Sequence, residues 1–153
     1  MKNLKICFAA SSGGHLEQLL MLAPLMGRYD SFLLTERTAY TVQAPVKIRY
    51  LSQVNRREHG WQRSMAANAW KSLGIFLKER PNAVICTGAL ATVPICLLCK
   101  FFGGRLIFLE SFAKVTSPTK TGKLLYRFAD RFYVQWPAMQ KVYPKALYLG
   151  GIY

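Results

Sequence analysis

Short, nearly all-apolar segments alternate with longer helix-like segments along the chain, and this alternation constrains the fold more than any other feature. Strands that are covered by helices on both faces have this apolar character. The predicted strands are 4–9, 31–35, 47–51, 83–86, 105–109, 131–134 and 146–149. The predicted helices are 15–26, 61–79, 89–102 and 119–129, with a loop or short helix at 38–43. The pattern predicts an α/β fold: a Rossmann-like, doubly wound, mainly parallel sheet in a single domain over residues 1–153.

The loops after three of the predicted strands contain the residues best suited to bind a ligand. Parallel strands present their carboxyl ends at one edge of the sheet, and ligands bind beyond that edge. The candidate binding residues in these loops are Ser11, Ser12, Gly13, Gly14, Thr87, Gly88, Ser111 and Phe112. Gly13 and Gly14 let the backbone approach a ligand, and the amides that begin the next helix attract phosphate. We therefore expect a ligand that carries a diphosphate.

Two other phosphate motifs fit the sequence poorly. The dinucleotide fingerprint GxGxxG is reduced to Gly13 and Gly14, although Glu36 lies near where a ribose-binding carboxylate would fall. The stretch TKTGKLL lacks the first glycine of a P-loop, and leucine follows Lys123 where that motif needs serine or threonine. A P-loop is therefore excluded, and a dinucleotide site is disfavoured.

Two titratable residues at this edge are candidates for catalysis. His15 begins a predicted helix, where the positive end of the helix dipole favours the neutral imidazole that a general base needs. Glu110 follows a buried strand, and a carboxylate there needs a partner or a function. The sequence leaves two structural alternatives open: local capping or packing by His15, and a salt bridge from Glu110 to a lysine or arginine.

The chain is strongly basic, with 21 lysine and arginine residues against 7 aspartate and glutamate residues and a net charge of +14. Such an excess favours an anionic partner: nucleic acid, phospholipid or a pyrophosphate. The basic residues are spread along the sequence, which has no helix-turn-helix, zinc or RNP pattern. We therefore expect no nucleic-acid partner.

The predicted helix 61–79 is the best candidate for contact with an anionic membrane surface. Its apolar residues, read as sharing one side, are Trp61, Met65, Trp70, Leu73 and Leu77. The basic residues that flank them are Arg56, Arg57, Arg63, Lys71, Lys78 and Arg80. A basic amphipathic helix of this kind lies in the bilayer interface. The alternative is a helix that covers the sheet with its apolar stripe and carries its charges for solvation.

Export, membrane insertion and metal binding are not expected. The opening segment MKNLKICFAASSGG has only about six apolar residues, fewer than a signal-peptide core needs. The charge-free run 81–99 approaches the ~20 residues of a membrane helix, but polar residues, glycine and proline interrupt it. Cys7, Cys86, Cys96 and Cys99 lie in apolar segments, which predicts reduced core thiols rather than a metal or redox site. We expect neither a metal nor a cofactor.

Three blocks carry a family resemblance: SSGGHLEQLL, TGALATVP and LIFLESFAKVTSPTKTGKLLYRFADRFYVQWP. Together they resemble the asparagine-linked glycosylation protein fourteen family, including bacterial relatives in capsule and exopolysaccharide clusters. The resemblance runs from the first strand to YPKALYLGG. It implies one half of a GT-B glycosyltransferase: the amino-terminal, acceptor-side domain, similar to that of the peptidoglycan enzyme MurG.

The resemblance also implies a reaction and its partners. A separate chain supplies the domain that binds most of the nucleotide sugar, and the two chains transfer the sugar to a sugar on an undecaprenyl pyrophosphate carrier. We expect His15, which matches the family's glycine-glycine-histidine loop, to be the base, with Glu110 second. The reaction is expected to be inverting and independent of metal. The carboxyl-terminal segment is rich in aromatic residues, among them Trp136, Tyr143, Tyr148 and Tyr153, and Trp136 and Tyr153 are the candidates for partner contact. Ordinary core packing of these aromatic residues is the alternative.

Location follows from the same resemblance. Eukaryotic members are typically tethered by an amino-terminal membrane helix, and none is predicted in this sequence. We expect peripheral association with the cytoplasmic face of the inner membrane, through residues such as Trp61, Arg63 and Trp70. The alternative function is a non-catalytic scaffold that recruits and activates the donor-binding chain.

Overall fold

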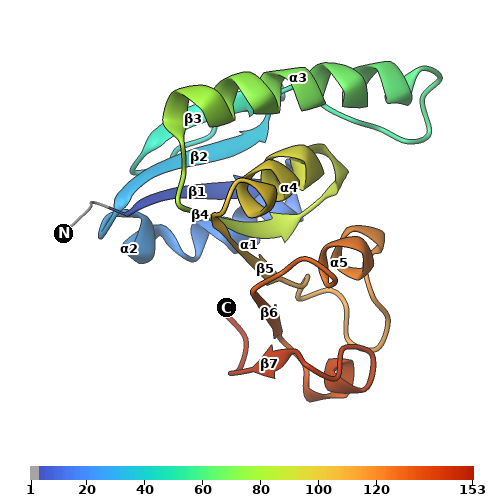
Figure 1. Cartoon of the computed structure of the whole chain (residues 1–153). Helices are drawn as coiled ribbons and strands as arrows, with labels where there is room; N and C mark the ends of the chain where they lie inside the picture. The colour runs from blue at the N-terminus through green and yellow to red at the C-terminus, as the bar shows by residue number, and fades with distance from the viewer. Residues whose placement is uncertain (1–3) are drawn as a thin grey trace.

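The computed structural model describes residues 4–153, in which seven parallel strands form one sheet (Figure 1). The strands are β1 (Lys5–Ala10), β2 (Asp30–Glu36), β3 (Lys47–Leu51), β4 (Ala83–Gly88), β5 (Arg105–Leu109), β6 (Arg131–Val134) and β7 (Leu147–Tyr148). Their order is β3-β2-β1-β4-β5-β6-β7, so the direction of winding reverses between β1 and β4. The predicted doubly wound parallel sheet is confirmed. The first residues of the segment weighed as a signal peptide, 1–3, lie outside the described residues.

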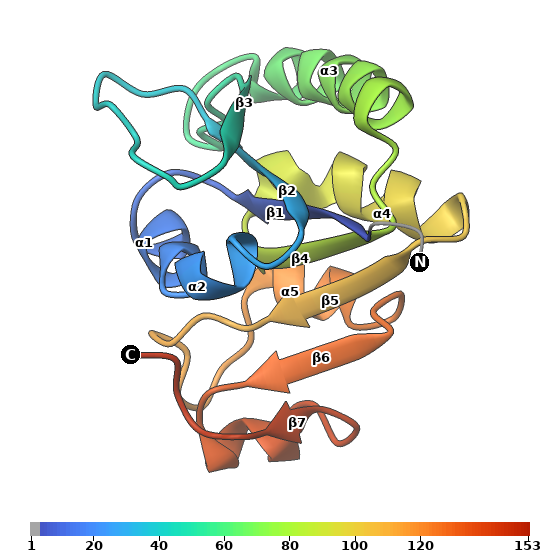
Figure 2. The ribbon, with the colours of Figure 1, turned by 90° about the vertical axis from the view of Figure 1, so that its left-hand side faces the viewer.

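Helices cover both faces of the sheet (Figures 1 and 2). Two short helices, α1 (Gly14–Leu20) and α2 (Ala23–Met26), lie on one face. The other face carries α3 (Trp61–Glu79), α4 (Val93–Phe101) and α5 (Lys120–Leu125). Two 3-10 helices, η1 (Leu90–Thr92) and η2 (Pro137–Lys141), complete the regular structure. This layering explains why the central strands are apolar on both faces.

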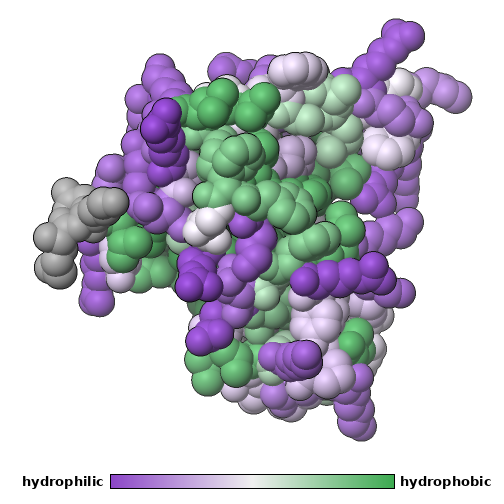
Figure 3. All heavy atoms as spheres, in the orientation of Figure 1, coloured by the Kyte–Doolittle hydropathy of each residue, from purple (hydrophilic) through white to green (hydrophobic). Residues whose placement is uncertain are grey.

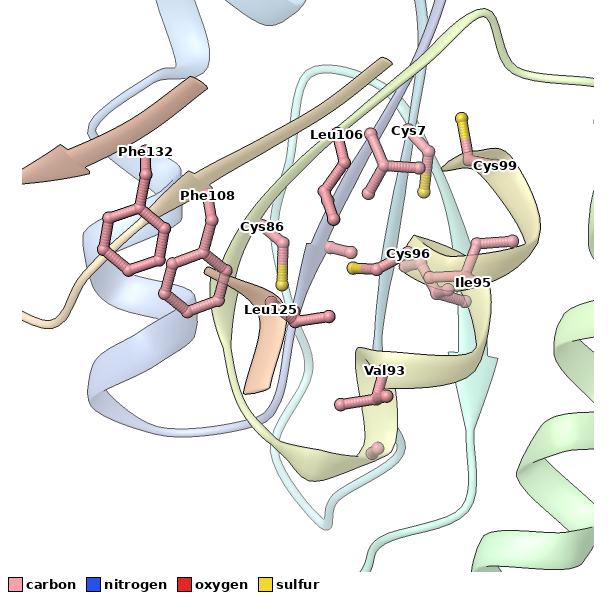
Figure 4. Close-up of a cluster of buried hydrophobic side chains, with 14 of the residues drawn as sticks. Cys7, Cys86, Val93, Ile95, Cys96, Cys99, Leu106, Phe108, Leu125 and Phe132 are labelled. Carbon is pink, nitrogen blue, oxygen red and sulfur yellow. The ribbon is translucent and has the colours of Figure 1, made fainter. Parts of the chain in front are cut away.

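Alternate residues of β1 divide the core into two clusters. Phe8 and Ala10 pack with α1 and α2, whereas Cys7 and Ala9 pack with the opposite helices. The second cluster contains all four cysteines, which are buried free thiols (Figure 4). Burial raises the pKa of the Cys7 thiol well above its ordinary value and that of Cys99 to about 11. These two thiols therefore stay protonated and pack as small apolar groups.

Three predicted helices are shorter than expected, and proline explains two of them. The segment 15–26 is two helices, because Pro24 has no amide hydrogen to continue α1 and instead stands in the first turn of α2. The segment 89–102 begins as the 3-10 helix η1, and Pro94 stands in the first turn of α4. The segment 119–129 is helical only over α5, and its remainder forms turns onto the Leu125 carbonyl. Residues 38–43 form a loop, and η2 was not predicted.

The apolar residues of α3 do not share one side, and that expectation was wrong. Trp61 and Met65 are half-buried on the side of the helix that covers the sheet, with Asn68 and Phe76. Trp70 comes nine residues after Trp61, which is two and a half turns, so it faces the opposite way. Trp70 is 76% exposed. The helix therefore covers the sheet with one face and presents a second apolar stripe outward.

The carboxyl ends of the strands lie together at one edge, on the left in Figure 2. The carboxyl-terminal segment also ends at this edge, whereas the described chain begins at the opposite edge (Figure 2). Thr87 and Gly88 are the last residues of β4 rather than part of the loop that follows it. The edge thus gathers the predicted site residues of the first, fourth and fifth strands.

Candidate functional site

His15 is hydrogen-bonded to the end of β4, where the sheet reverses its winding. Its Nδ1 atom lies 2.8 Å from the Thr87 carbonyl oxygen, and the Thr87 hydroxyl donates to the His15 carbonyl at 2.7 Å. Because a carbonyl oxygen only accepts, this contact assigns the proton to Nδ1. Nε2 of the neutral ring then carries a lone pair. His15 is half-buried and Thr87 is fully buried. The ring is therefore held through Nδ1, and Nε2 has no hydrogen-bond partner among the described residues.

The glycine loop beside His15 is open to a ligand. Gly13 has a φ of 77°, a conformation that favours glycine, and it stands directly before α1. Side chains added at Gly13 or Gly14 would meet no atom within 4 Å. Within residues 4–153, the amides of Gly13, Gly14 and His15 donate to no acceptor. Three free N–H groups therefore lie beside the imidazole.

Gly88 lets the end of β4 approach the histidine. Its φ is 109°, and a Cβ there would lie 3.1 Å from the Cε1 and Nδ1 atoms of His15. The Gly88 carbonyl accepts a bond of 2.7 Å from the Ser11 amide, which joins the ends of β1 and β4. A side chain at Gly88 would push the imidazole aside.

Glu36, at the end of β2, holds the other side of the glycine loop. Its Oε2 accepts bonds from the Ser12 amide at 3.1 Å and hydroxyl at 3.0 Å, and its Oε1 accepts one from the Val54 amide at 2.9 Å. Two hollows flank this contact. One of about 840 Å³ is lined by Gly13 and the 38–43 loop, and one of about 300 Å³ is lined by Ser11 and Lys120. Glu36 thus supports the loop, a role that the sequence alone did not reveal.

The Glu110 carboxylate is 1% exposed and already accepts four hydrogen bonds. Oε1 accepts from the Ser111 amide at 2.9 Å and the Thr119 hydroxyl at 2.8 Å. Oε2 accepts from the Thr119 amide at 3.2 Å and the Tyr143 hydroxyl at 2.9 Å. Burial and the nearby Glu110 charge raise the pKa of Tyr143, so the phenol remains a donor. No salt bridge to Glu110 exists within the described chain; its partners are neutral donors.

Two buried glutamines that sequence reasoning missed link these loops. Gln18, on α1, donates to the Glu110 carbonyl at 3.3 Å and accepts from the Phe112 amide at 3.1 Å. Gln135, just after β6, donates to the same carbonyl at 3.0 Å and accepts from the Ile152 amide at 3.1 Å. The only sequence signal is a glutamine one helical turn after His15, and one directly after a predicted strand. Through Gln18, α1 connects His15 to the loop after β5.

Phe112, Trp136 and Tyr153 form one aromatic group at the same edge. The Trp136 Nε1 atom donates to the Phe112 carbonyl at 2.6 Å. The Phe112 ring lies 5.0 Å from the rings of both Trp136 and Tyr153. A residue predicted for acceptor binding therefore packs directly on two predicted for partner contact. Trp61, Arg63 and Trp70 lie on α3, outside the hydrogen-bond network traced through the described residues.

Two further features bear on function. Among the described helices, none combines the length and apolar character needed to cross a membrane. Over residues 4–153, no three His, Cys, Asp or Glu side chains gather as a metal site would require.

Comparison with known proteins places this geometry in context. The family model described as "Oligosaccharide biosynthesis protein Alg14 like" matches residues 46–152. The human protein named UDP-N-acetylglucosamine transferase subunit ALG14 is 28% identical over 181 residues, covering 99% of this chain and 84% of its own length.

Solved structures share the fold at low sequence identity. MurG from Acinetobacter baumannii superposes with a TM-score of 0.69 at 15% identity, over 88% of this chain and 42% of its own. UDP-GlcNAc 2-epimerase from Methanocaldococcus jannaschii gives a TM-score of 0.72 at 11% identity, over 97% of this chain and 46% of its own. This chain thus spans less than half the length of those two proteins.

Proposed function

Because the chain belongs to the Alg14 family, we propose that it is the acceptor-binding, membrane-associated subunit of a two-chain glycosyltransferase. The relatives are named as UDP-N-acetylglucosamine transferase subunits, so UDP-N-acetylglucosamine is the first donor to test. The proposed acceptor is a sugar on an undecaprenyl pyrophosphate carrier, in capsule or exopolysaccharide synthesis. The observation that carries the proposal is His15 held through Nδ1 at the winding reversal, with Nε2 left without a partner among the described residues.

His15 is the proposed general base. The acceptor hydroxyl attacks the anomeric carbon of the donor sugar, forming a new carbon–oxygen bond as the bond to the nucleoside diphosphate breaks. The hydroxyl proton passes to Nε2 of His15, because Nδ1 is already engaged by the Thr87 carbonyl. The nucleoside diphosphate is the leaving group, and the partner chain holds it. Attack from the face opposite the leaving group inverts the anomeric centre. The roles proposed for this chain's residues need no metal.

The glycine loop is proposed to hold the acceptor's pyrophosphate. The free amides of Gly13, Gly14 and His15 point to a ligand with several negatively charged oxygens. Ser11, Ser12, Thr87 and Gly88 shape this part of the edge, and Ser111 and Phe112 shape the part beside β5.

Glu110 is proposed to position the loop after β5 rather than to take a proton. Each of its oxygens already accepts two hydrogen bonds inside the protein. A base must reach the acceptor hydroxyl, and a carboxylate that is 1% exposed does not.

The partner surface is proposed to be the aromatic end of the same edge. Trp136 and Tyr153 pack on Phe112, so a donor-binding chain that contacts them also contacts the acceptor loop. Aromatic residues are enriched in the centres of such interfaces. The resulting cleft has one wall from each chain.

Membrane contact is proposed to use the outward face of α3. Trp70 and Leu77 are 76% and 55% exposed there, beside Arg63. The apolar surface continues to Phe101 and Phe102 at the end of α4, and Figure 3 shows hydrophobic side chains gathered over this region among hydrophilic ones. The 19-residue helix is about 28 Å long. Lying flat on the cytoplasmic leaflet, it would hold the chain close to a lipid-borne acceptor.

The test is sugar transfer from radiolabelled nucleotide sugars to a membrane lipid extract. The chain is assayed alone, with its donor-binding partner, and with the partner after His15→Asn. Asparagine retains a donor at the position of Nδ1 but has no Nε2, so we expect a loss of about 10²- to 10⁴-fold. His59→Asn, in the exposed loop before α3, is the matched control and retains activity.

Complex formation is measured alongside by gel filtration. Loss of transfer with an intact complex supports His15 as the base. Full activity of His15→Asn removes His15 from catalysis, and activity of the partner without this chain supports the scaffold function instead.

A further inference from the structure

A positively charged groove runs between the edge strand β3 and α3, and we propose that it binds the phosphate-bearing headgroup of an anionic phospholipid. The proposal rests on the proposed docking of α3 to the membrane, but it assigns a distinct site with its own lining. The groove has a volume of about 490 Å³. Its lining shares no residue with the two hollows beside the glycine loop.

Four cations line this groove, and only one of them is neutralised. Arg49 donates to the Glu79 carboxylate. Arg37 lies 4.6 Å above the Tyr50 ring, and Lys71 donates to the Ser52 hydroxyl at 2.7 Å. Within residues 4–153, the side chains of Arg37, Lys71 and Lys78 have no carboxylate within salt-bridge distance. Three uncompensated charges around one hollow favour a phosphate.

Gly74 leaves room for that phosphate on α3. A Cβ added to Gly74 would meet no atom within 4 Å, and its φ lies outside the left-handed region. Gly74 lies one turn from both Lys71 and Lys78, so the gap opens between the two lysines. A long side chain at this position would enter the groove without straining the backbone, whereas a single Cβ meets no atom.

The exposed apolar residues on α3 select a lipid as the source of the phosphate. Trp70 lies four residues before Gly74 and Leu77 three residues after it, so both border the same part of the helix. A headgroup in the groove therefore places its acyl chains against the exposed Trp70 and Leu77 side chains. A soluble phosphate ester would leave that apolar surface uncovered.

The experiment measures co-sedimentation of the full chain with phosphatidylcholine vesicles, with and without phosphatidylglycerol. The wild-type protein is expected to prefer the vesicles that contain phosphatidylglycerol. Gly74→Gln fills the groove with no change in charge and is expected to abolish this preference, whereas Gly74→Ala retains it. Lys71→Gln with Lys78→Gln lowers binding by about fivefold for each cation removed. Arg127→Gln with Lys145→Gln, on another hollow, is the charge-matched control and changes binding less than about twofold.

The outcomes of this experiment distinguish the headgroup site from the proposed docking of α3 to the membrane, on which it rests. If Trp70→Ala weakens binding to both vesicles while Gly74→Gln behaves like the wild type, docking stands and the groove is not a headgroup site. An equal loss of binding in the variant with Lys71→Gln and Lys78→Gln and in the control with Arg127→Gln and Lys145→Gln also overturns the inference. If the wild type sediments with neither vesicle, both proposals fail. Glycerol phosphate added at the same headgroup concentration is expected to leave binding unchanged; displacement makes a soluble phosphate ester the ligand and overturns the lipid assignment.

Discussion

His15 and Glu110 stand at the same edge of one sheet, yet their surroundings differ completely. The His15 ring has one nitrogen bound to the Thr87 carbonyl and presents the other from a half-buried position. Glu110 is buried and has both oxygens satisfied by four donors. A group that reacts with a ligand must keep an unused hydrogen-bonding atom, and Glu110 has none to offer. The comparison therefore supports the proposed roles of His15 as the base and Glu110 as a positioning residue.

The largest expected effect on stability comes from Glu110→Gln. The amide cannot accept at both of its terminal atoms, so two buried donors face an NH₂ group, and we expect a loss of about 3 kcal/mol in the free energy of unfolding. His15→Asn should change it by less than about 0.5 kcal/mol, because the bond to Thr87 is retained. Urea denaturation of both variants measures the contrast. Unchanged stability in Glu110→Gln with lost transfer would reassign that residue to catalysis.

A pair of glycines gives the next largest contrast. A Cβ at Gly122 would overlap the Glu110 carboxylate and lie 2.7 Å from the Thr119 hydroxyl, so Gly122→Ala is expected to cost about 2 kcal/mol. Gly14→Ala enters open space at the start of α1 and should leave the unfolding free energy within about 0.5 kcal/mol. Thermal and urea unfolding test this, and equal losses at the two positions would contradict the saturated packing around Glu110.

Thr87→Val tests the surroundings of His15, the other residue of the comparison. Valine has the shape of threonine but loses the hydroxyl bond to the His15 carbonyl, while the Thr87 carbonyl still holds Nδ1. We expect a loss of about 1 kcal/mol in unfolding free energy. Transfer activity should fall far less than in His15→Asn. A loss of activity as large as that of His15→Asn would make the hydroxyl, rather than Nε2, the decisive group.

Mild acid should have the smallest effect, and it acts through other carboxylates. Hydrogen bonds from Lys5 and Arg49 lower the pKa of Glu79 to about 2. Burial alone would raise the pKa of Asp130, but bonds from Lys100, the Leu106 amide and Arg105 lower it to about 2. Because both folded pKa values lie below the unfolded ones, their stabilisation is complete above about pH 4.5 and is lost as the pH falls toward 2. Thermal unfolding between pH 7 and 3 checks this, with Glu79→Gln expected to show a weaker pH dependence.

Periodicity was sufficient to predict the sheet, its edge and the loops that meet there, because each buried strand carries its apolar signal locally. The break at Pro24 and the opposed faces of Trp61 and Trp70 also follow from local rules, proline chemistry and 100° of rotation per residue. The hydrogen bonding of the buried Glu110 carboxylate does not follow from local rules. Three of the four donors to its carboxylate come from positions 119 and 143, and Gln18 reaches the Glu110 carbonyl across 92 residues. No spacing in the sequence encodes these meetings, since they depend on how the loops pack after the sheet has formed.

The contact between the carboxyl-terminal segment and the site has a practical consequence for handling the protein. The Ile152 amide is bound by Gln135, and Tyr153 packs on Phe112. Any polypeptide joined after Tyr153 would therefore emerge beside the loop that follows β5. An affinity tag or fluorescent reporter placed there would crowd the proposed acceptor-binding loops, whereas one placed before β1 would stand at the far edge of the sheet.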